Sequence, residues 1–152
     1  MAEGVYFEDY LQGQKYLTNR RTITETDHVH FSTLCGFWEP LFMDREYVEN
    51  ETQFEKPIVP GALTFSFSEG LTILTGILNR TGMAFLGAEM KVLKPVHIGD
   101  TIRVEIEVME KRETKKPDRG IVTFRHRTLN QKDVVVLEYR VNRMIRRKTG
   151  EV

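Results

Sequence analysis

A long stretch with almost no charge most constrains how this chain of 152 residues can fold. Between Pro60 and Asn79 the only charged residue is Glu69, and apolar residues recur at helical spacings of three or four. They are Leu63, Phe67, Leu71, Leu74 and Leu78. Because apolar residues surround most of the helix, the sequence predicts burial on several sides. The helix should begin at Pro60-Gly61, where proline loses no needed hydrogen bond.

A membrane span is the competing interpretation of this stretch. A span needs about 20 mostly apolar residues. Serines and threonines interrupt the stretch, and amphipathic segments follow it directly. We therefore expect a buried central helix and no membrane partner.

The second half of the chain alternates between apolar and polar residues. Residues 102–108, 122–127 and 135–142 each follow a period of two, and turn sequences separate them. Such segments are typical of half-buried antiparallel strands. One long helix followed by these strands predicts an α+β fold in which an antiparallel sheet wraps around the helix, in a single domain over residues 1–152.

The first half is predicted to be helical and irregular. Thr24 and Asp27 have the spacing of a helix cap, and a helix should run from there to about Leu34 and stop at Gly36. Residues 37–56 mix a proline with acidic and short apolar runs. They predict an irregular overhang with one or two short turns.

Composition and charge indicate a partner class and a compartment. The single cysteine, Cys35, fits a reducing compartment, and the acidic N-terminus does not resemble a secretory signal, so we expect a cytoplasmic protein. Residues 1–76 carry seven more acidic than basic residues, and residues 77–152 show the reverse excess. Most of these cations should be solvated strand residues, with a few available to a phosphate. No stacking motif accompanies them, so nucleic acid is not an expected partner.

Two short motifs carry a resemblance to a known family. Gly36-Phe-Trp-Glu-Pro-Leu-Phe-Met-Asp44 and Pro57-Ile-Val-Pro-Gly-Ala-Leu63 resemble the active-site segment of the MaoC-like hydratases and dehydratases. This family has the hot-dog fold and includes the (R)-specific enoyl-CoA hydratases. The similarity covers roughly residues 5–147, including Pro95–Thr101. It implies activity on a 2-enoyl-CoA or 3-hydroxyacyl thioester, and no further cofactor.

The resemblance breaks at the catalytic positions. Phe37 stands where the family has its catalytic Asp, and Phe42 where it has its catalytic His. Phenylalanine neither accepts nor donates a proton, so the family mechanism does not run through them. Gly61 keeps the position whose backbone N–H polarises the thioester carbonyl. We therefore expect Gly61, Phe37 and Phe42 to contact the substrate.

Two carboxylates are candidates for the missing chemistry. Glu39 lies between the two changed positions, and Glu69 is the one charge of the central helix. In the related β-hydroxyacyl-carrier-protein dehydratases the acid corresponds to Ser66, one turn before Glu69. A desolvated Glu69 could act as general acid or base, or it could pair with an arginine or reach the dimer surface. Lys91, Lys94 and Arg103 are candidates for contacting coenzyme A phosphates, and the alternative is that they are exposed strand cations.

Three functions follow from this pattern. The first is a hydratase or dehydratase with rearranged catalytic groups. The second is a noncatalytic acyl-CoA-binding or structural subunit, paired with an active MaoC-like partner, and the third is a hot-dog thioesterase. The thioester carrier is coenzyme A or an acyl carrier protein. No histidine pair has metal-ligand spacing, and one hot-dog leaves its sheet poorly covered, so we expect no metal and a homodimer or higher oligomer.

Overall fold

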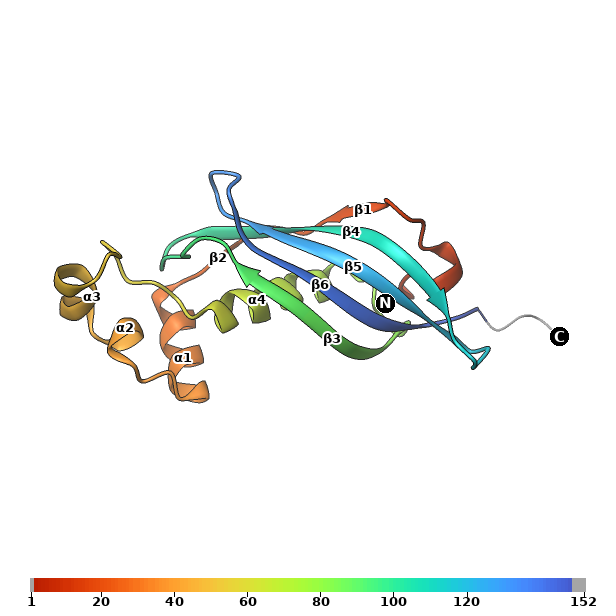
Figure 1. Ribbon diagram of the computed structural model, residues 1–152, viewed down its shortest axis with the longest axis horizontal. Helices are drawn as coiled ribbons and strands as arrows, with labels where there is room; N and C mark the ends of the chain where they lie inside the picture. The colour runs from red at the N-terminus through yellow and green to blue at the C-terminus, as the bar shows by residue number, and fades with distance from the viewer. Residues whose placement is uncertain (1, 149–152) are drawn as a thin grey trace.

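An antiparallel sheet curves around one long helix in the computed structural model, which describes residues 2–148 (Figure 1). The strand order is β1-β4-β5-β6-β3, and β2 pairs with β4. The predicted hot-dog arrangement is confirmed. The helical elements are η1 (Phe7–Asp9), α1 (Glu25–Cys35), α2 (Pro40–Met43), α3 (Arg45–Glu51) and α4 (Gly61–Leu74). The strands are β1 (Lys15–Leu17), β2 (Arg21–Thr22), β3 (Gly82–Val92), β4 (Thr101–Glu113), β5 (Arg119–Leu129) and β6 (Val135–Arg146).

The predicted alternation of the long strands is confirmed. Side chains on the inner face of β4 and β5 are fully buried, among them Ile106 and Phe124. On the outer face, Glu105 pairs with Arg127 at 2.8 Å and Glu107 pairs with Arg125 on the neighbouring strand. These cross-strand ion pairs account for part of the positive charge in the second half of the chain.

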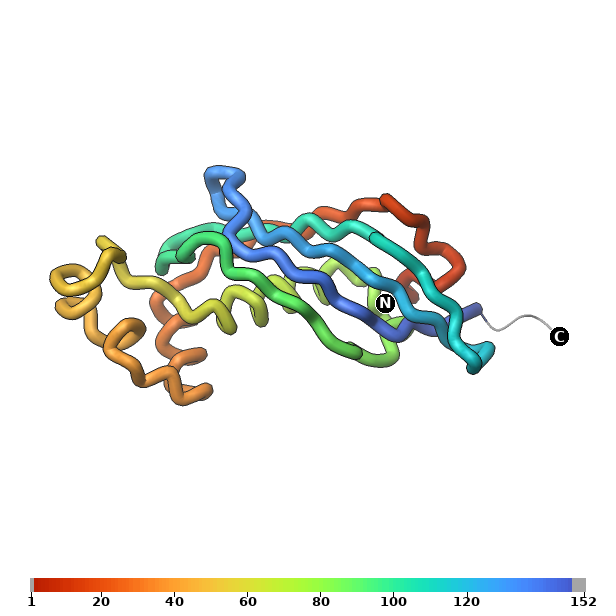
Figure 2. The backbone as a smooth tube through the Cα atoms, viewed as in Figure 1, coloured from red at the N-terminus to blue at the C-terminus, as the bar shows by residue number. Residues whose placement is uncertain are grey.

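Helix α1 begins and ends where the sequence predicts. The Thr24 hydroxyl accepts from the Asp27 amide, and the Asp27 carboxylate accepts from the Thr24 amide. Gly36 ends the helix with φ 79°, a left-handed conformation that glycine adopts without steric cost. Together with α2 and α3, this helix forms the overhang, which lies beyond the sheet at the end where α4 starts (Figure 2).

Helix α4 begins at Gly61 as predicted but ends one turn early. It stops at Leu74, and Leu78 lies outside it because Gly76 takes φ 81°. The predicted burial on several sides is also wrong for the single chain. The exposed fractions of Ile73 and Leu74 are 61% and 78%, because the sheet covers only one side of the helix.

Strand β3 forms one edge of the sheet and pairs only with β6 among the strands described. Its large apolar side chains are partly exposed, as are those just after it: Met83, Phe85, Leu86, Met90, Val92 and Leu93. An apolar edge of this length is a natural surface for a second chain. No helix within residues 2–148 has the length and apolar character needed to cross a bilayer.

A substitution at Gly120 on β5 tests how tightly η1 packs on the sheet. A Cβ added there would lie 2.3 Å from the Phe7 ring, so we expect Gly120→Ala to lower the free energy of unfolding by about 1–3 kcal/mol through overpacking. Urea unfolding followed by circular dichroism measures this change. Gly70→Ala is the matched control, since nothing lies within 4 Å of its Cβ position and alanine favours a helix. Equal effects of the two substitutions would contradict the packing argument.

Candidate functional site

An apolar cavity of about 320 Å³ lies at the start of α4. The overhang contributes Phe42 and Phe54, and the helix contributes Gly61 and Thr64. The remaining walls come from the segment before α4, the end of β3 and the start of β6: Ile58, Val59, Val92, Leu93, Lys94, Pro95, Val96, Val136 and Leu137. Its volume and apolar walls are typical of small-molecule sites.

The polar feature of this cavity is the helix N-terminus itself. The amides of Leu63 and Thr64 donate to the Pro60 carbonyl, whereas those of Gly61 and Ala62 make no hydrogen bond to residues 2–148. Free amides at a helix start carry partial positive charge and attract a negatively charged oxygen. A Cβ on Gly61 would lie 3.0 Å from Val92 Cγ2, so glycine keeps this approach open.

An aromatic pair occupies the expected acid–base positions. The rings of Phe37 and Phe42 meet edge to face with centroids 5.8 Å apart, and Phe31 packs on the other side of Phe37 at 5.9 Å. Phe42 lines the cavity, while Phe37 supports it from behind. His28 Nε2 lies 2.7 Å from the Phe42 carbonyl oxygen and fixes this part of the overhang. The pair can shape a ligand but transfers no proton.

The other predicted site residues are spread over the structure. Lys94 lines the cavity, whereas Lys91 is exposed on β3 and does not line it. Glu39 is exposed and precedes α2 as its N-cap residue, without a cap bond from its side chain. Glu69 lies two turns beyond Gly61 and does not line the cavity. The catalytic roles of the two glutamates stay predictions.

Glu69 belongs to a buried polar cluster between α4 and the sheet. Arg143 Nη2 donates to both carboxylate oxygens, at 2.7 Å and 2.6 Å, and the Tyr139 hydroxyl donates to Oε1 at 2.7 Å. His126 Nδ1 lies 3.9 Å from Oε1 and 3.3 Å from the Thr72 hydroxyl. The expected alternative of an arginine partner is therefore what the structure shows. Arg143 was not among the site residues predicted from the sequence, although the alternation of β6 continues past Val141 and points Arg143 inward.

Burial controls the protonation of this cluster. Burial, and secondarily the positive charge of Arg143, lower the pKa of His126 to about 3, so its ring is neutral at pH 7. Burial and the neighbouring Glu69 carboxylate raise the pKa of Tyr139. Its hydroxyl therefore keeps its proton and acts as a donor. Within residues 2–148 no group of three or more His, Cys, Asp or Glu side chains is placed to hold a metal ion.

Comparisons with known proteins agree with this fold. The model of the MaoC-like domain matches residues 9–130, and the chain belongs to this family. Protein MaoC of Klebsiella aerogenes is 36% identical over 116 residues, which are 76% of this chain and 33% of that protein. The (R)-specific enoyl-CoA hydratase of Aeromonas caviae is 33% identical over 119 residues, 78% of this chain and 83% of the hydratase. The chain therefore spans about a third of the first relative and most of the second.

A solved structure agrees over nearly the whole chain. The monoamine oxidase regulatory protein from Archaeoglobus superposes with a TM-score of 0.90 and 34% identity, covering 97% of this chain and 98% of that one. The hot-dog domain and its overhang are thus shared with proteins of the family.

His126 should make stability depend on pH. Its pKa falls from an ordinary 6.5 to about 3 on folding, so the unfolded chain binds more protons between these values. The contribution of neutral His126 to the free energy of unfolding is fully present above about pH 6.5 and is lost as the pH falls toward 3. We expect His126→Gln to flatten the fall in unfolding free energy between about pH 7.5 and 5.

Urea unfolding at several pH values measures this slope. His30→Gln is the control, since it makes the same change of side chain at an exposed position on α1. A slope in His126→Gln equal to that of the unaltered protein would show that His126 protonates equally in both states.

Proposed function

We propose that this protein is an acyl-CoA-binding member of the MaoC-like hydratases and dehydratases in which the site binds the thioester without supplying the acid–base pair. It works as the noncatalytic half of a hot-dog assembly. The observation that carries this proposal is the open amide of Gly61 beside an apolar cavity whose lining includes no carboxylate and no imidazole among the described residues.

The binding part of the proposal follows from the chemistry of a thioester. Its carbonyl oxygen accepts hydrogen bonds, and a preorganised backbone N–H at a helix start supplies one without reorganisation. The acyl chain then lies against the apolar walls formed by residues such as Val92 and Leu137. Lys94 at the same cavity carries the positive charge that suits a coenzyme A or carrier-protein phosphate.

The noncatalytic part follows from what surrounds that carbonyl. Hydration of a 2-enoyl thioester needs one group to take a proton from water and another to give a proton to the α-carbon. Phe42 lines the cavity and Phe37 packs against it, and these are the two positions at which the family resemblance predicts the base and the acid. Lys94 is the one ionisable residue among those lining the cavity, so the described part of the chain offers no pair.

A second hot-dog chain is the natural partner. The exposed apolar edge of β3 and the open side of α4 present a surface suited to another hot-dog domain. We propose a dimer along this edge, either with a second copy or with an active MaoC-like chain. In a dimer with an active MaoC-like chain, that chain provides the catalytic groups. This chain then provides stability and ligand contacts, which gives the aromatic pair of Phe37 and Phe42 a role.

Binding at Gly61 can be tested directly. We expect the protein to bind crotonyl-CoA, and Gly61→Ala to weaken this binding by roughly tenfold, because the added methyl group lies against Val92 and narrows the approach to the amide. Isothermal titration calorimetry measures the affinity. Gly70→Ala makes the same change in the open middle of the helix and should bind as the unaltered protein does. An unchanged affinity of Gly61→Ala for crotonyl-CoA would contradict the proposed carbonyl site at Gly61.

Restoring the family's acid–base pair tests the catalytic part. The unaltered homogeneous protein should not hydrate crotonyl-CoA, whereas the double variant Phe37→Asp/Phe42→His should, because the scaffold already positions the thioester. Loss of enoyl absorbance follows the reaction, and Phe37→Asn/Phe42→Gln is the polar control without an acid or a base. Hydration by the unaltered protein would contradict the noncatalytic proposal.

The second candidate function is a hydratase or thioesterase whose catalytic groups all come from this chain. The proximity of Glu69 to His126 favours it, since a carboxylate and an imidazole are the groups such chemistry uses. Should the unaltered protein hydrate crotonyl-CoA or hydrolyse a thioester, Glu69→Gln and Glu39→Gln decide between the two predicted carboxylates. Loss of activity in only one of them assigns the role.

A further inference from the structure

The segment that carries Lys94 is paired with the segment that leads into α4. Ile58 and His97 form an antiparallel bridge. In antiparallel pairing each step forward along one segment is matched by a step back along the other, so three steps from this bridge set Gly61 opposite Lys94. Both residues line the apolar cavity of about 320 Å³ that is proposed to bind the thioester. The pairing therefore brings a primary amine to the cavity that contains the free amide of Gly61.

Hydrogen bonds hold the backbone of Lys94 on both sides. The Val59 amide, two residues before Gly61, donates to the carbonyl of Val96, two residues after Lys94, at 2.9 Å. On the other side, the amide of Lys94 donates to the Val136 carbonyl on β6 at 3.2 Å. These bonds fix the position from which the Lys94 side chain starts, so its stem stays at the cavity.

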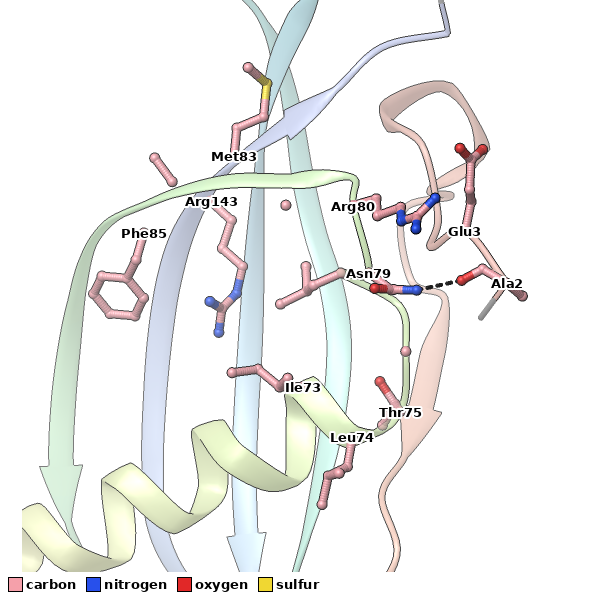
Figure 3. Close-up of a pocket in the computed structure, with 14 residues that line it drawn as sticks. Ala2, Glu3, Ile73, Leu74, Thr75, Asn79, Arg80, Met83, Phe85 and Arg143 are labelled. Carbon is pink, nitrogen blue, oxygen red and sulfur yellow. Dashed lines mark hydrogen bonds between the residues drawn. The ribbon is translucent and has the colours of Figure 1, made fainter.

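The amine of Lys94 is available to a ligand. Its side chain is exposed and makes no hydrogen bond or ion pair with residues 2–148, and the described residues that share its cavity include no carboxylate. Arg143 is the buried cation of the larger cavity, of about 790 Å³, at the other end of α4 (Figure 3). Glu69 already neutralises Arg143, so the two cations differ in what they can offer a ligand.

A primary amine attacks a thioester without help from an acid–base pair. The neutral amine is itself the nucleophile, and a thiolate leaves readily because thiols are acidic. A protein accelerates such a reaction by proximity and by a donor for the carbonyl oxygen, which becomes negatively charged as the amine adds. The cavity offers both, because Lys94 lies opposite Gly61 and the Gly61 amide is free.

We propose that Lys94 accepts the acyl group of a thioester bound at Gly61. The reaction depends on the thioester site proposed above and adds the chemical fate of its ligand. The neutral Nζ adds to the carbonyl carbon while the Gly61 amide donates to the oxyanion. The carbon–sulfur bond then breaks, and the proton lost by Nζ goes to the leaving thiolate. The products are one N-acyl-lysine and one free thiol, so no oxidant, reductant or other co-reactant is needed.

The modification closes its own site. The described residues that line the cavity include no acid–base pair to cleave the new amide, so the reaction occurs once per chain. The attached acyl chain then lies in the apolar cavity, and Lys94 no longer carries a positive charge. An acylated chain should therefore bind crotonyl-CoA at least roughly tenfold more weakly than the unmodified protein.

Mass spectrometry of the full chain tests the reaction with butyryl-CoA, whose saturated chain offers the amine no second position to attack. We follow it over days, because only the neutral amine reacts and acylation is much slower than binding. We expect one butyryl group per chain, mapped to Lys94, and one released thiol per group. Lys91 is the internal control. It is also exposed but does not line the cavity, so it should react at least roughly tenfold more slowly.

Two comparisons show whether the cavity directs the reaction. Gly61→Ala narrows the approach to the amide and should slow butyrylation of Lys94 by roughly tenfold, without changing that of Lys91. Gly70→Ala is the matched control and should leave both rates unchanged. Excess S-butyl-CoA, which cannot transfer its chain, should protect Lys94 but not Lys91, and this comparison needs no substitution.

Calorimetry on the same samples separates failure of the reaction from failure of the thioester site. Binding of butyryl-CoA without butyrylation of Lys94 would overturn the acyl transfer and leave the thioester site intact, as expected if Lys94 contacts only a phosphate. Equal rates at Lys94 and Lys91, unaffected by Gly61→Ala, would overturn it as well, since the reaction would then be unassisted surface chemistry. Absence of both binding and butyrylation would contradict the thioester site together with the reaction.

Discussion

The ion pair between Glu69 on α4 and Arg143 on β6 determines how the central helix sits on the sheet. Breaking a buried pair of this kind typically costs about 3–5 kcal/mol, because the remaining charge has no partner. Two hydroxyl contacts also join α4 to the sheet: Ser68 with Thr128 at 2.7 Å, and Thr72 with His126 at 3.3 Å. Together they set the rotation and height of α4, and therefore place Gly61 beside Val92 at the start of the helix.

The same ion pair keeps the Glu69 carboxylate away from the cavity at Gly61. Glu69 is held by two donors in the interior and does not reach the cavity at Gly61, where the overhang places Phe42 instead. A thioester bound as proposed would find a hydrogen-bond donor at Gly61, and the described residues that line the cavity include no carboxylate and no imidazole. The family fold is retained here, and Phe37 and Phe42, the positions at which the sequence resemblance predicts the acid–base pair, belong to an aromatic cluster.

Local patterns were enough to predict most of the fold. The cap at Thr24, the start of α4 and the alternation of β4 to β6 depend on neighbouring residues, so the sequence shows them directly. The early end of α4 was missed because Leu78 continues the helical spacing, and only the backbone of Gly76 breaks it. Arg143 was missed because, although the alternation of β6 points it inward, its partner Glu69 lies 74 residues away in the chain, and no local pattern shows that pairing. Strands β1 and β2 are too short to show a period.

The central claim is that a thioester carbonyl accepts a hydrogen bond from the Gly61 amide in a site without an acid–base pair. Carbon-13 NMR of crotonyl-CoA labelled at the carbonyl carbon tests this most directly. We expect the resonance of the bound thioester to move downfield, as polarisation by a hydrogen bond requires, and to remain that of an enoyl thioester for hours. The downfield shift should be absent in Gly61→Ala. A bound carbonyl with the chemical shift of the free thioester, or rapid appearance of the hydrated product, would contradict the claim.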